Sequence, residues 1–188
     1  MKSFNEARLR AMEPEDLELI YRIENDPTFW QHGTTTVPYS RYAIRQYLES
    51  AQNDIFKDGQ VRLVIEAREG RSEWRVERKD WREEAGLWRT VGLADLCNFD
   101  ALHLRAEIGL AILPEFQSQG LGEVAMRQLE AYAQRLNLHQ LYAVIASGNQ
   151  PANRLFQRLN YQSSTRLRDW LRQGDTFTDA LVWQKILS

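Results

Sequence analysis

Apolar and polar residues alternate along several short stretches of the chain, which is the spacing of half-buried β-strands. The pattern covers residues 7–12, 60–69, 89–99, 104–112 and 141–146. Two further stretches near the C-terminus, joined by a polar segment over 172–179, predict a closing antiparallel hairpin, with strands at 164–171 and 180–187.

Apolar residues at three- and four-residue spacing predict four helices, at residues 13–23, 40–51, 120–136 and 149–160. Ser40 and Asn149 stand where a helix N-cap is expected. Asn160 suits the left-handed conformation that ends a helix. Residues 24–39 are rich in turn formers.

This order of elements predicts an α/β (α+β) fold with a mixed, mostly antiparallel central sheet of about six or seven strands, flanked by helices. The 188 residues suit one domain, 1–188. A charged insertion over about 70–88 carries Trp74, Trp81 and Trp88. Exposed tryptophans favour an interface, but we prefer a solvated hairpin extension or short helix with its tryptophans laid on the domain.

Composition excludes several classes of function. The net charge of −2 offers no basic field for nucleic acid. No apolar run approaches the roughly 18 residues of a membrane span, and no signal-peptide core is present, so we expect a cytoplasmic protein that does not bind membranes. Self-association as a homo-oligomer stays open.

The chain offers no pattern of metal or disulfide chemistry. A single cysteine, Cys97, excludes an intrachain disulfide and is interpreted as a small buried residue. His32, His103 and His139 lie far apart without metal-ligand spacing, so no metal site is expected.

The strand at 104–112 has two unlike faces. Its even-numbered residues are apolar and face the core, whereas Glu107 is followed on the other face by the small residues Gly109 and Ala111. Small residues inside a strand indicate either that a ligand approaches the backbone or that a helix packs there.

The segment "QSQGLG", residues 117–122, precedes an amphipathic helix. The first N–H groups of such a helix attract anions, so an anion site is the economical interpretation, with a simple tight turn as the alternative. A Walker loop is excluded because Glu123 and Val124 stand where lysine and a hydroxyl residue are needed. A dinucleotide fingerprint, though matched as far as Ala125, fails because "LPEFQSQ" separates it from the strand and no acid follows the next strand.

This loop resembles the acetyl-CoA loop Q/R-x-x-G-x-G/A of the GNAT superfamily of N-acetyltransferases. "NQPANRLFQRLNY" is similar to the family's N-x-x-A-x-x-x-Y-x-x-x-G-F element, and "RLRDWLRQGDTFTDALVW" to its closing hairpin. The resemblance spans almost the whole chain and is strongest to the spermidine and ribosomal-protein acetyltransferase branch.

The resemblance implies acetyl-CoA as cosubstrate and places its binding residues. Pantetheine would lie along Leu110, Ala111 and Ile112. The pyrophosphate would bind the N–H groups of Gln117, Ser118, Gln119, Gly120, Leu121 and Gly122. Asn149, Ala152, Asn153 and Phe156 would border the cofactor's other side.

The implied chemistry is attack of a neutral amine on the thioester through a tetrahedral oxyanion, in a ternary complex. The backbone N–H of Ile112 would bind the oxyanion. Because a free alkylamine has a pKa near 10.4, a proton acceptor is needed, and Glu107 is the candidate general base. The alternative is that Glu107 pairs with Arg105 or another neighbour, or faces solvent.

One position departs from the family pattern. Phe156 replaces the tyrosine that protonates the leaving thiolate in many relatives. Water, Tyr161 and Ser147 stay open as substitutes.

The acceptor is less well defined than the cofactor. A polyamine-like or other small primary amine is the leading hypothesis. The alternatives are a protein N-terminus or amino-acid amine, and a non-catalytic acetyl-CoA-binding regulatory module. Glu24 and Asp26 are the nearest acids for a polyamine, although we interpret them as solvated charges at a helix end.

Overall fold

The computed structural model describes residues 4–30, 37–69 and 88–187. The strands are β1 (Phe4–Ala11), β2 (Val61–Glu69), β3 (Trp88–Asp100), β4 (Arg105–Ile112), β5 (Gln140–Ala146), β6 (Gln162–Gln173) and β7 (Thr176–Ile186). The α-helices are α1 (Leu17–Asn25), α2 (Pro27–Trp30), α3 (Arg41–Ser50), α4 (Ile55–Asp58), α5 (Leu121–Arg135) and α6 (Gln150–Arg158). Two 3₁₀ turns, η1 (Pro14–Asp16) and η2 (Pro114–Phe116), precede α1 and α5.

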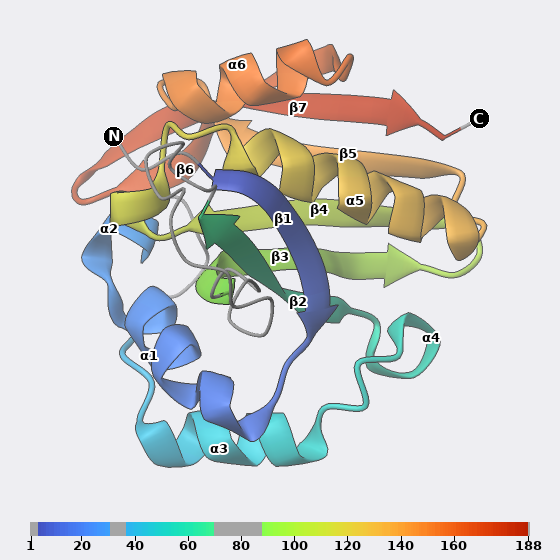
Figure 1. The fold of residues 1–188 in the computed structure, drawn as a ribbon. Helices are drawn as coiled ribbons and strands as arrows, with labels where there is room; N and C mark the ends of the chain where they lie inside the picture. Colours follow the sequence, from blue (N-terminus) through green and yellow to red (C-terminus); the bar gives the residue numbers. More distant parts are fainter. Residues whose placement is uncertain (1–3, 31–36, 70–87, 188) are drawn as a thin grey trace, which may run out of the picture.

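The strands form one seven-stranded sheet in the order β1-β2-β3-β4-β5-β7-β6 (Figure 1). Every neighbouring pair is antiparallel except β4 and β5, which run parallel. The predicted mixed, mostly antiparallel sheet with flanking helices is therefore confirmed.

Two apolar clusters cover the two faces of the sheet. The larger joins α5 and α6 to the inward residues of β2 to β5, with Met126, Leu129 and Leu141 fully buried. The smaller joins α1 and α3 to Val64 and Leu93. In Figure 1, α1 and α3 lie together and away from α5 and α6. The alternation read from the sequence thus places helices on both faces.

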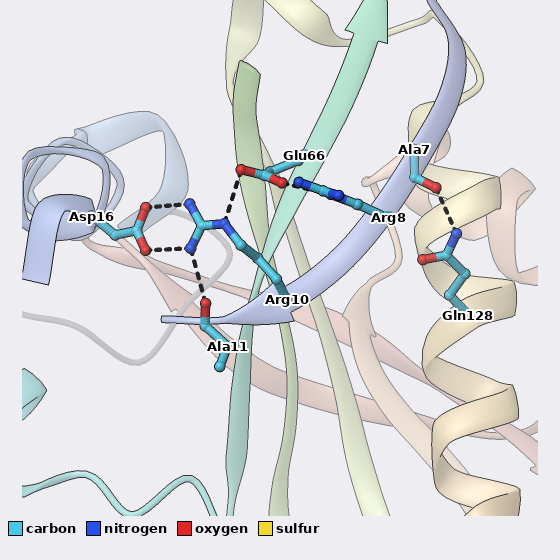
Figure 2. A network of polar contacts seen from close by, with 7 residues as sticks. All are labelled: Ala7, Arg8, Arg10, Ala11, Asp16, Glu66 and Gln128. Carbon is cyan, nitrogen blue, oxygen red and sulfur yellow. Dashed lines mark hydrogen bonds and ion pairs between the residues drawn. The ribbon is translucent and has the colours of Figure 1, made fainter. Parts of the chain in front are cut away.

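A buried polar network joins the first strand to its neighbours (Figure 2). The guanidinium of Arg10 donates two hydrogen bonds to the carboxylate of Asp16, at 2.6 and 2.7 Å, and one to Glu66 at 2.9 Å. Arg8 donates to the other Glu66 oxygen at 2.8 Å, and the Glu13 N–H donates to Asp16 at 2.8 Å. The network holds the start of α1 against β1 and β2.

The same network changes the ionisation of Asp16. Burial by itself would raise the pKa of this carboxyl group. The hydrogen bonds from Arg10 and from the Glu13 N–H, together with the positive charge of Arg10, outweigh burial and hold the pKa of Asp16 below its usual value. On the opposite face, the side chain of Gln128 on α5 donates to the Ala7 carbonyl at 2.7 Å (Figure 2).

Three local predictions need correction. The turn-rich stretch contains α2, and the segment before β2 contains α4. The predicted polar connection over 172–179 is mostly strand, because Gln173 pairs with Thr176 across a two-residue turn whose Gly174 has φ of 61°.

Most of the charged insertion, with Trp74 and Trp81, lies outside the described residues. Trp88 begins β3, where the Arg8 guanidinium lies 4.1 Å from its ring centroid. In the described part of the chain, no helix combines the length and hydrophobicity that crossing a membrane requires.

Candidate active site

The parallel strands β4 and β5 pair over three residues only, from Arg105 with Gln140 to Glu107 with Tyr142. Beyond this point β5 continues to pair with β7, while β4 continues to pair with β3. The C-terminal half of β4 therefore has an open edge on the β5 side.

Strand geometry identifies the backbone groups on this edge. The Leu113 N–H donates to the Val91 carbonyl of β3 at 2.9 Å, so Leu113 and Val91 form a hydrogen-bonded pair of the ladder between β3 and β4. Because bonded and non-bonded pairs alternate in an antiparallel ladder, the N–H and C=O groups of Ile112 and Leu110 point the other way, into the opening. Leu110 and Ile112, two of the residues predicted to bind pantetheine, thus have backbone groups on the open edge of β4.

The side chain of Gln117 reaches this edge as well. Its Nε2 donates to the Ile112 carbonyl at 2.8 Å, which ties the loop after β4 back to the strand end. Gln119 similarly donates to the Glu115 carbonyl at 3.1 Å, and Glu115 forms an ion pair with Arg22 of α1. The loop is therefore held on both sides.

The loop itself fits an anion. Ser118 and Gly120 have φ of 60° and 80°, in the left-handed region. Gly120 is the N-cap of α5, and no side chain caps it. Successive N–H groups in such a loop, followed by an uncapped helix N-terminus, form a concave set of donors for a phosphate. The chain's own residues therefore fit the pyrophosphate of acetyl-CoA.

Gly122 serves packing in this structure. A Cβ at this position would lie 3.2 Å from Leu110 Cδ2 and 3.5 Å from Leu155 Cδ2. The missing side chain lets the first turn of α5 approach β4 and α6 closely, which brings the donors near the open edge.

The residues predicted on α6 hold this helix beside the opening. Asn149 caps it by accepting from the Ala152 N–H at 3.2 Å. Asn153 is buried and donates to the carbonyls of Ala146 and Ser147, at 3.1 and 3.3 Å, while accepting from the Trp183 indole at 2.8 Å. These bonds fix the N-terminus of α6 at the C-terminal end of β5.

Phe156 is a core residue in this structure. It is buried, and its ring meets those of Tyr161 and Trp183 at centroid distances of 4.8 and 6.4 Å. Burial, and then the Glu130 carboxylate, raise the pKa of the Tyr161 hydroxyl above its usual value. Glu130 is paired with Lys185, which stands beside the beginning of β5. The Tyr161 hydroxyl is thus directed toward the end of the sheet opposite the opening.

Ser147, the other sequence candidate for a proton donor, directly follows β5. Its N–H donates to the Asp179 carbonyl of β7 at 2.8 Å, and its own carbonyl accepts from Asn153 of α6 at 3.3 Å, so Ser147 lies beside the N-terminal part of α6. Of the two side chains, Ser147 lies at the open end of the sheet.

Glu107 projects from the face of β4 that carries Gly109 and Ala111, and its side chain is half-buried. Its Oε2 accepts from Asn98 Nδ2 at 2.8 Å. Arg105, the alternative partner considered above, forms its ion pair with Asp100 at 3.0 Å. The neighbour that holds Glu107 is thus an amide.

Two ionisable neighbours flank Glu107 across the sheet. Cys97 pairs with it on β3 and Tyr142 on β5. Burial, and then the Glu107 charge, raise the pKa of the Cys97 thiol to about 12 and also raise that of Tyr142. Cys97 is half-buried, more accessible than predicted, and it is protonated at neutral pH.

A second charged group on this face was not predicted. Arg62 bonds Asp95 at 2.9 Å and Glu24 at 2.6 Å. Burial raises the pKa of Asp95 despite the opposing charge of Arg62. A Cβ on Gly109 would lie 3.4 Å from that of Asp95, so the glycine leaves the carboxylate room. The sequence signal that could have indicated this group is Asp95, an acidic residue within the otherwise apolar strand "GLADLCNF".

The two acids proposed near the first helix behave differently. Glu24 is not a solvated charge, because it pairs with Arg62 and its side chain is only 18% exposed. It also lines a pocket of about 290 Å³ between α1, α3 and β2, together with Tyr39 and Tyr47. Asp26 accepts from the Thr28 N–H and hydroxyl, which is a local turn contact.

Comparison with known proteins identifies the family of this chain. The family model described as the acetyltransferase (GNAT) domain matches residues 7–162. The spermidine N(1)-acetyltransferase of Escherichia coli K12 is 24% identical over 162 residues, covering 86% of this chain and 75% of that protein. An uncharacterized N-acetyltransferase, YoaA of Bacillus subtilis, is 27% identical over 177 residues, covering 93% and 90%.

A solved structure shows the same fold. Spermidine N-acetyltransferase from Vibrio cholerae, in complex with CoA and spermine, superposes with a TM-score of 0.76 at 21% identity, covering 96% of this chain and 95% of that chain. The chain belongs to the GNAT family. It is an acetyl-CoA-dependent N-acetyltransferase. Among the residues that the structure describes, no cluster of His, Cys, Asp and Glu side chains could hold a metal ion.

Proposed function

We propose that this enzyme acetylates a primary amine of a small, polyamine-like substrate, by direct attack within a ternary complex. The observation that carries the proposal is the open edge of β4, which lies beside the uncapped start of α5 and bears a carboxylate, Glu107, on the same strand. Cofactor and proton acceptor are thereby held by one strand, one loop and one helix.

Acetyl-CoA is recognised by two elements, the open edge of β4 and the loop before α5. The pantetheine arm lies along Leu110, Ala111 and Ile112 and hydrogen-bonds the backbone groups of Leu110 as an added strand would, while the Ile112 N–H is left for the acetyl carbonyl. The N–H groups of residues 117–122 receive the pyrophosphate. Asn149 and Ala152, at the N-terminus of α6, form the opposite wall and Asn153 holds this helix in place, whereas Phe156 faces the core.

The bound cosubstrate supplies an acetyl thioester, and the protein supplies the groups around it. The Ile112 N–H points into the opening, where it stabilises negative charge developing on the carbonyl oxygen. Glu107 accepts the proton that an alkylammonium must lose before it attacks, directly or through water. We assign protonation of the leaving thiolate to Ser147, which directly follows β5, and the thiolate pKa of about 8.5 makes that help modest in size.

The charge around the site supports a cationic acceptor. Glu107, Asp95 and Glu24 follow one another across one face of the sheet, and Arg62 bonds both Asp95 and Glu24. Because Glu107 is held by the neutral amide of Asn98, this carboxylate adds negative charge to the face, which favours a cationic acceptor. The spermidine acetyltransferases among its relatives support the same class of acceptor.

The deciding experiment is acetyl-CoA turnover, followed by thiol release, over a panel of polyamines, amino acids and peptides with free N-termini. We expect the highest kcat/KM with a polyamine. Preference for a peptide N-terminus would overturn the acceptor class, and acetyl-CoA binding in calorimetry without turnover on any amine would favour a regulatory module.

Glu107→Gln tests the base. We expect kcat to fall by about 10²- to 10⁴-fold with little change in acetyl-CoA affinity. Glu49→Gln, at an exposed position on α3, is the control and should behave as wild type. An unchanged rate and pH profile in Glu107→Gln would remove Glu107 from the mechanism.

A further inference from the structure

The strand beside the proposed base contains a bulge. Cys97 pairs with Glu107 and Asp100 pairs with Arg105, so β3 carries one extra residue over this interval. Asn98 lies in the bulge with φ of 50°, in the left-handed region that asparagine tolerates better than most residues. Bulges next to active sites commonly redirect a side chain.

The redirected side chain is the amide of Asn98. Its Nδ2 donates to Glu107 Oε2 at 2.8 Å. An amide is a neutral donor, so it fixes the carboxylate without forming the ion pair that would weaken a base. The nearby cation, Arg105, is engaged by Asp100 at 3.0 Å.

We propose that Asn98 is a positioning residue for the reaction, which holds the Glu107 carboxylate so that Oε1 receives the proton of the acceptor amine. This inference rests on the proposed role of Glu107 as base. The other ionisable groups facing Glu107 are Cys97 and Asp95 on β3, Tyr142 on β5 and Arg105 on β4. Substituting Asn98 alone alters none of these side chains.

Two substitutions separate the donor from the backbone. Asn98→Gly removes the amide at a φ that glycine adopts freely, and Asn98→Asp keeps the shape but replaces the donor with an anionic acceptor. We expect kcat to fall by about 10-fold in the first and further in the second, with unchanged KM for acetyl-CoA.

Asn137 provides the matched control. It has φ of 57° after the end of α5, so Asn137→Gly and Asn137→Asp make the same changes in the same backbone conformation away from the site. These variants should keep wild-type kcat and pH profile. Melting temperatures of all four variants show whether each is folded.

The double variant Asn98→Gly/Glu107→Gln decides whether Asn98 acts through Glu107. If it does, the double variant is no slower than Glu107→Gln alone. Additive losses would overturn the inference, as would wild-type kinetics in both Asn98 variants while Glu107→Gln is impaired. If Glu107→Gln itself is unimpaired, the base assignment fails and this inference fails with it, while turnover of acetyl-CoA still stands.

Discussion

Gly92 on β3 is the position where the smallest substitution should do most damage to the site. A Cβ built there would lie 2.1 Å from the Ala111 carbonyl oxygen and 3.1 Å from Ile112 Cα. Both atoms belong to the backbone of β4 where it pairs with β3, opposite the open edge, so no side-chain rotation relieves the contact. We therefore expect Gly92→Ala to push β4 away from β3.

The magnitude follows from the distance. Restoring an ordinary contact requires the new Cβ and the Ala111 oxygen to move apart by about 1 Å. Overpacking of this kind lowers the free energy of unfolding by about 1–3 kcal/mol, and a contact with rigid backbone lies at the upper end of that range. A protein of 188 residues loses about 2–4 °C in Tm per kcal/mol, so we expect a fall of about 6–12 °C. A displacement of 1 Å at the Ile112 N–H should also lower kcat/KM by about 10²-fold.

Gly109→Ala on β4 is the matched comparison. Its Cβ would lie 3.4 Å from that of Asp95, an ordinary contact, so the change in Tm should stay within about 3 °C of wild type. Thermal unfolding followed by circular dichroism measures both variants. Equal melting temperatures for Gly92→Ala and Gly109→Ala would refute the argument, because the two differ mainly in what the new methyl group meets.

Two further predictions concern the loop and the N-terminal network. Gly120→Ala should weaken acetyl-CoA binding by about 10-fold in calorimetry, because φ of 80° strains alanine and the methyl group enters the donor loop. The control Gly59→Ala, with φ of 67° at the end of α4, carries the same strain but should bind acetyl-CoA normally. Equal affinities of the two variants would contradict the loop assignment. Asp16→Asn should cost about 2 kcal/mol in the free energy of unfolding at pH 7, where the charge-assisted bonds with Arg10 are complete. Because the folded pKa of Asp16 lies below its usual value, this stabilisation is present above the ordinary carboxyl pKa near 3.9 and disappears as the pH falls through the lower folded value. The free energies of unfolding of wild type and variant, measured by urea titration, should therefore converge in acid. A difference that stays constant with pH would contradict the network.

Local chemistry was largely readable from the chain. The caps at Ser40 and Asn149 and the left-handed Asn160 appear as predicted, because each depends on one residue and its immediate neighbours. The alternation of 104–112 likewise placed Ala106 and Ile108 in the core.

Contacts between distant segments were not readable in the same way. Nothing in the spacing of "DLCNF" indicates a bulge, yet the bulge is what brings Asn98 to Glu107. Arg62, Asp95 and Glu24 come from three separate elements, and their ion pairs exist because the sheet places β2 beside β3 and α1 above both. Pairing partners of this kind depend on strand order, which hydrophobic periodicity does not specify.

The sequence by itself indicated an anion site, since a strand, a glycine loop and a helix in that order carry their anion-binding chemistry in consecutive residues. Its resemblance to the loop, helix and hairpin of the GNAT superfamily indicated the class of the enzyme. The tertiary structure decided which backbone groups are available and which side chains meet. Leu110 and Ile112 face an opening because β5 leaves β4 after three pairs to follow β7, and Phe156 faces the core because α6 is fixed by Asn153 and Trp183. These outcomes depend on how the whole sheet closes, a property that no single segment contains.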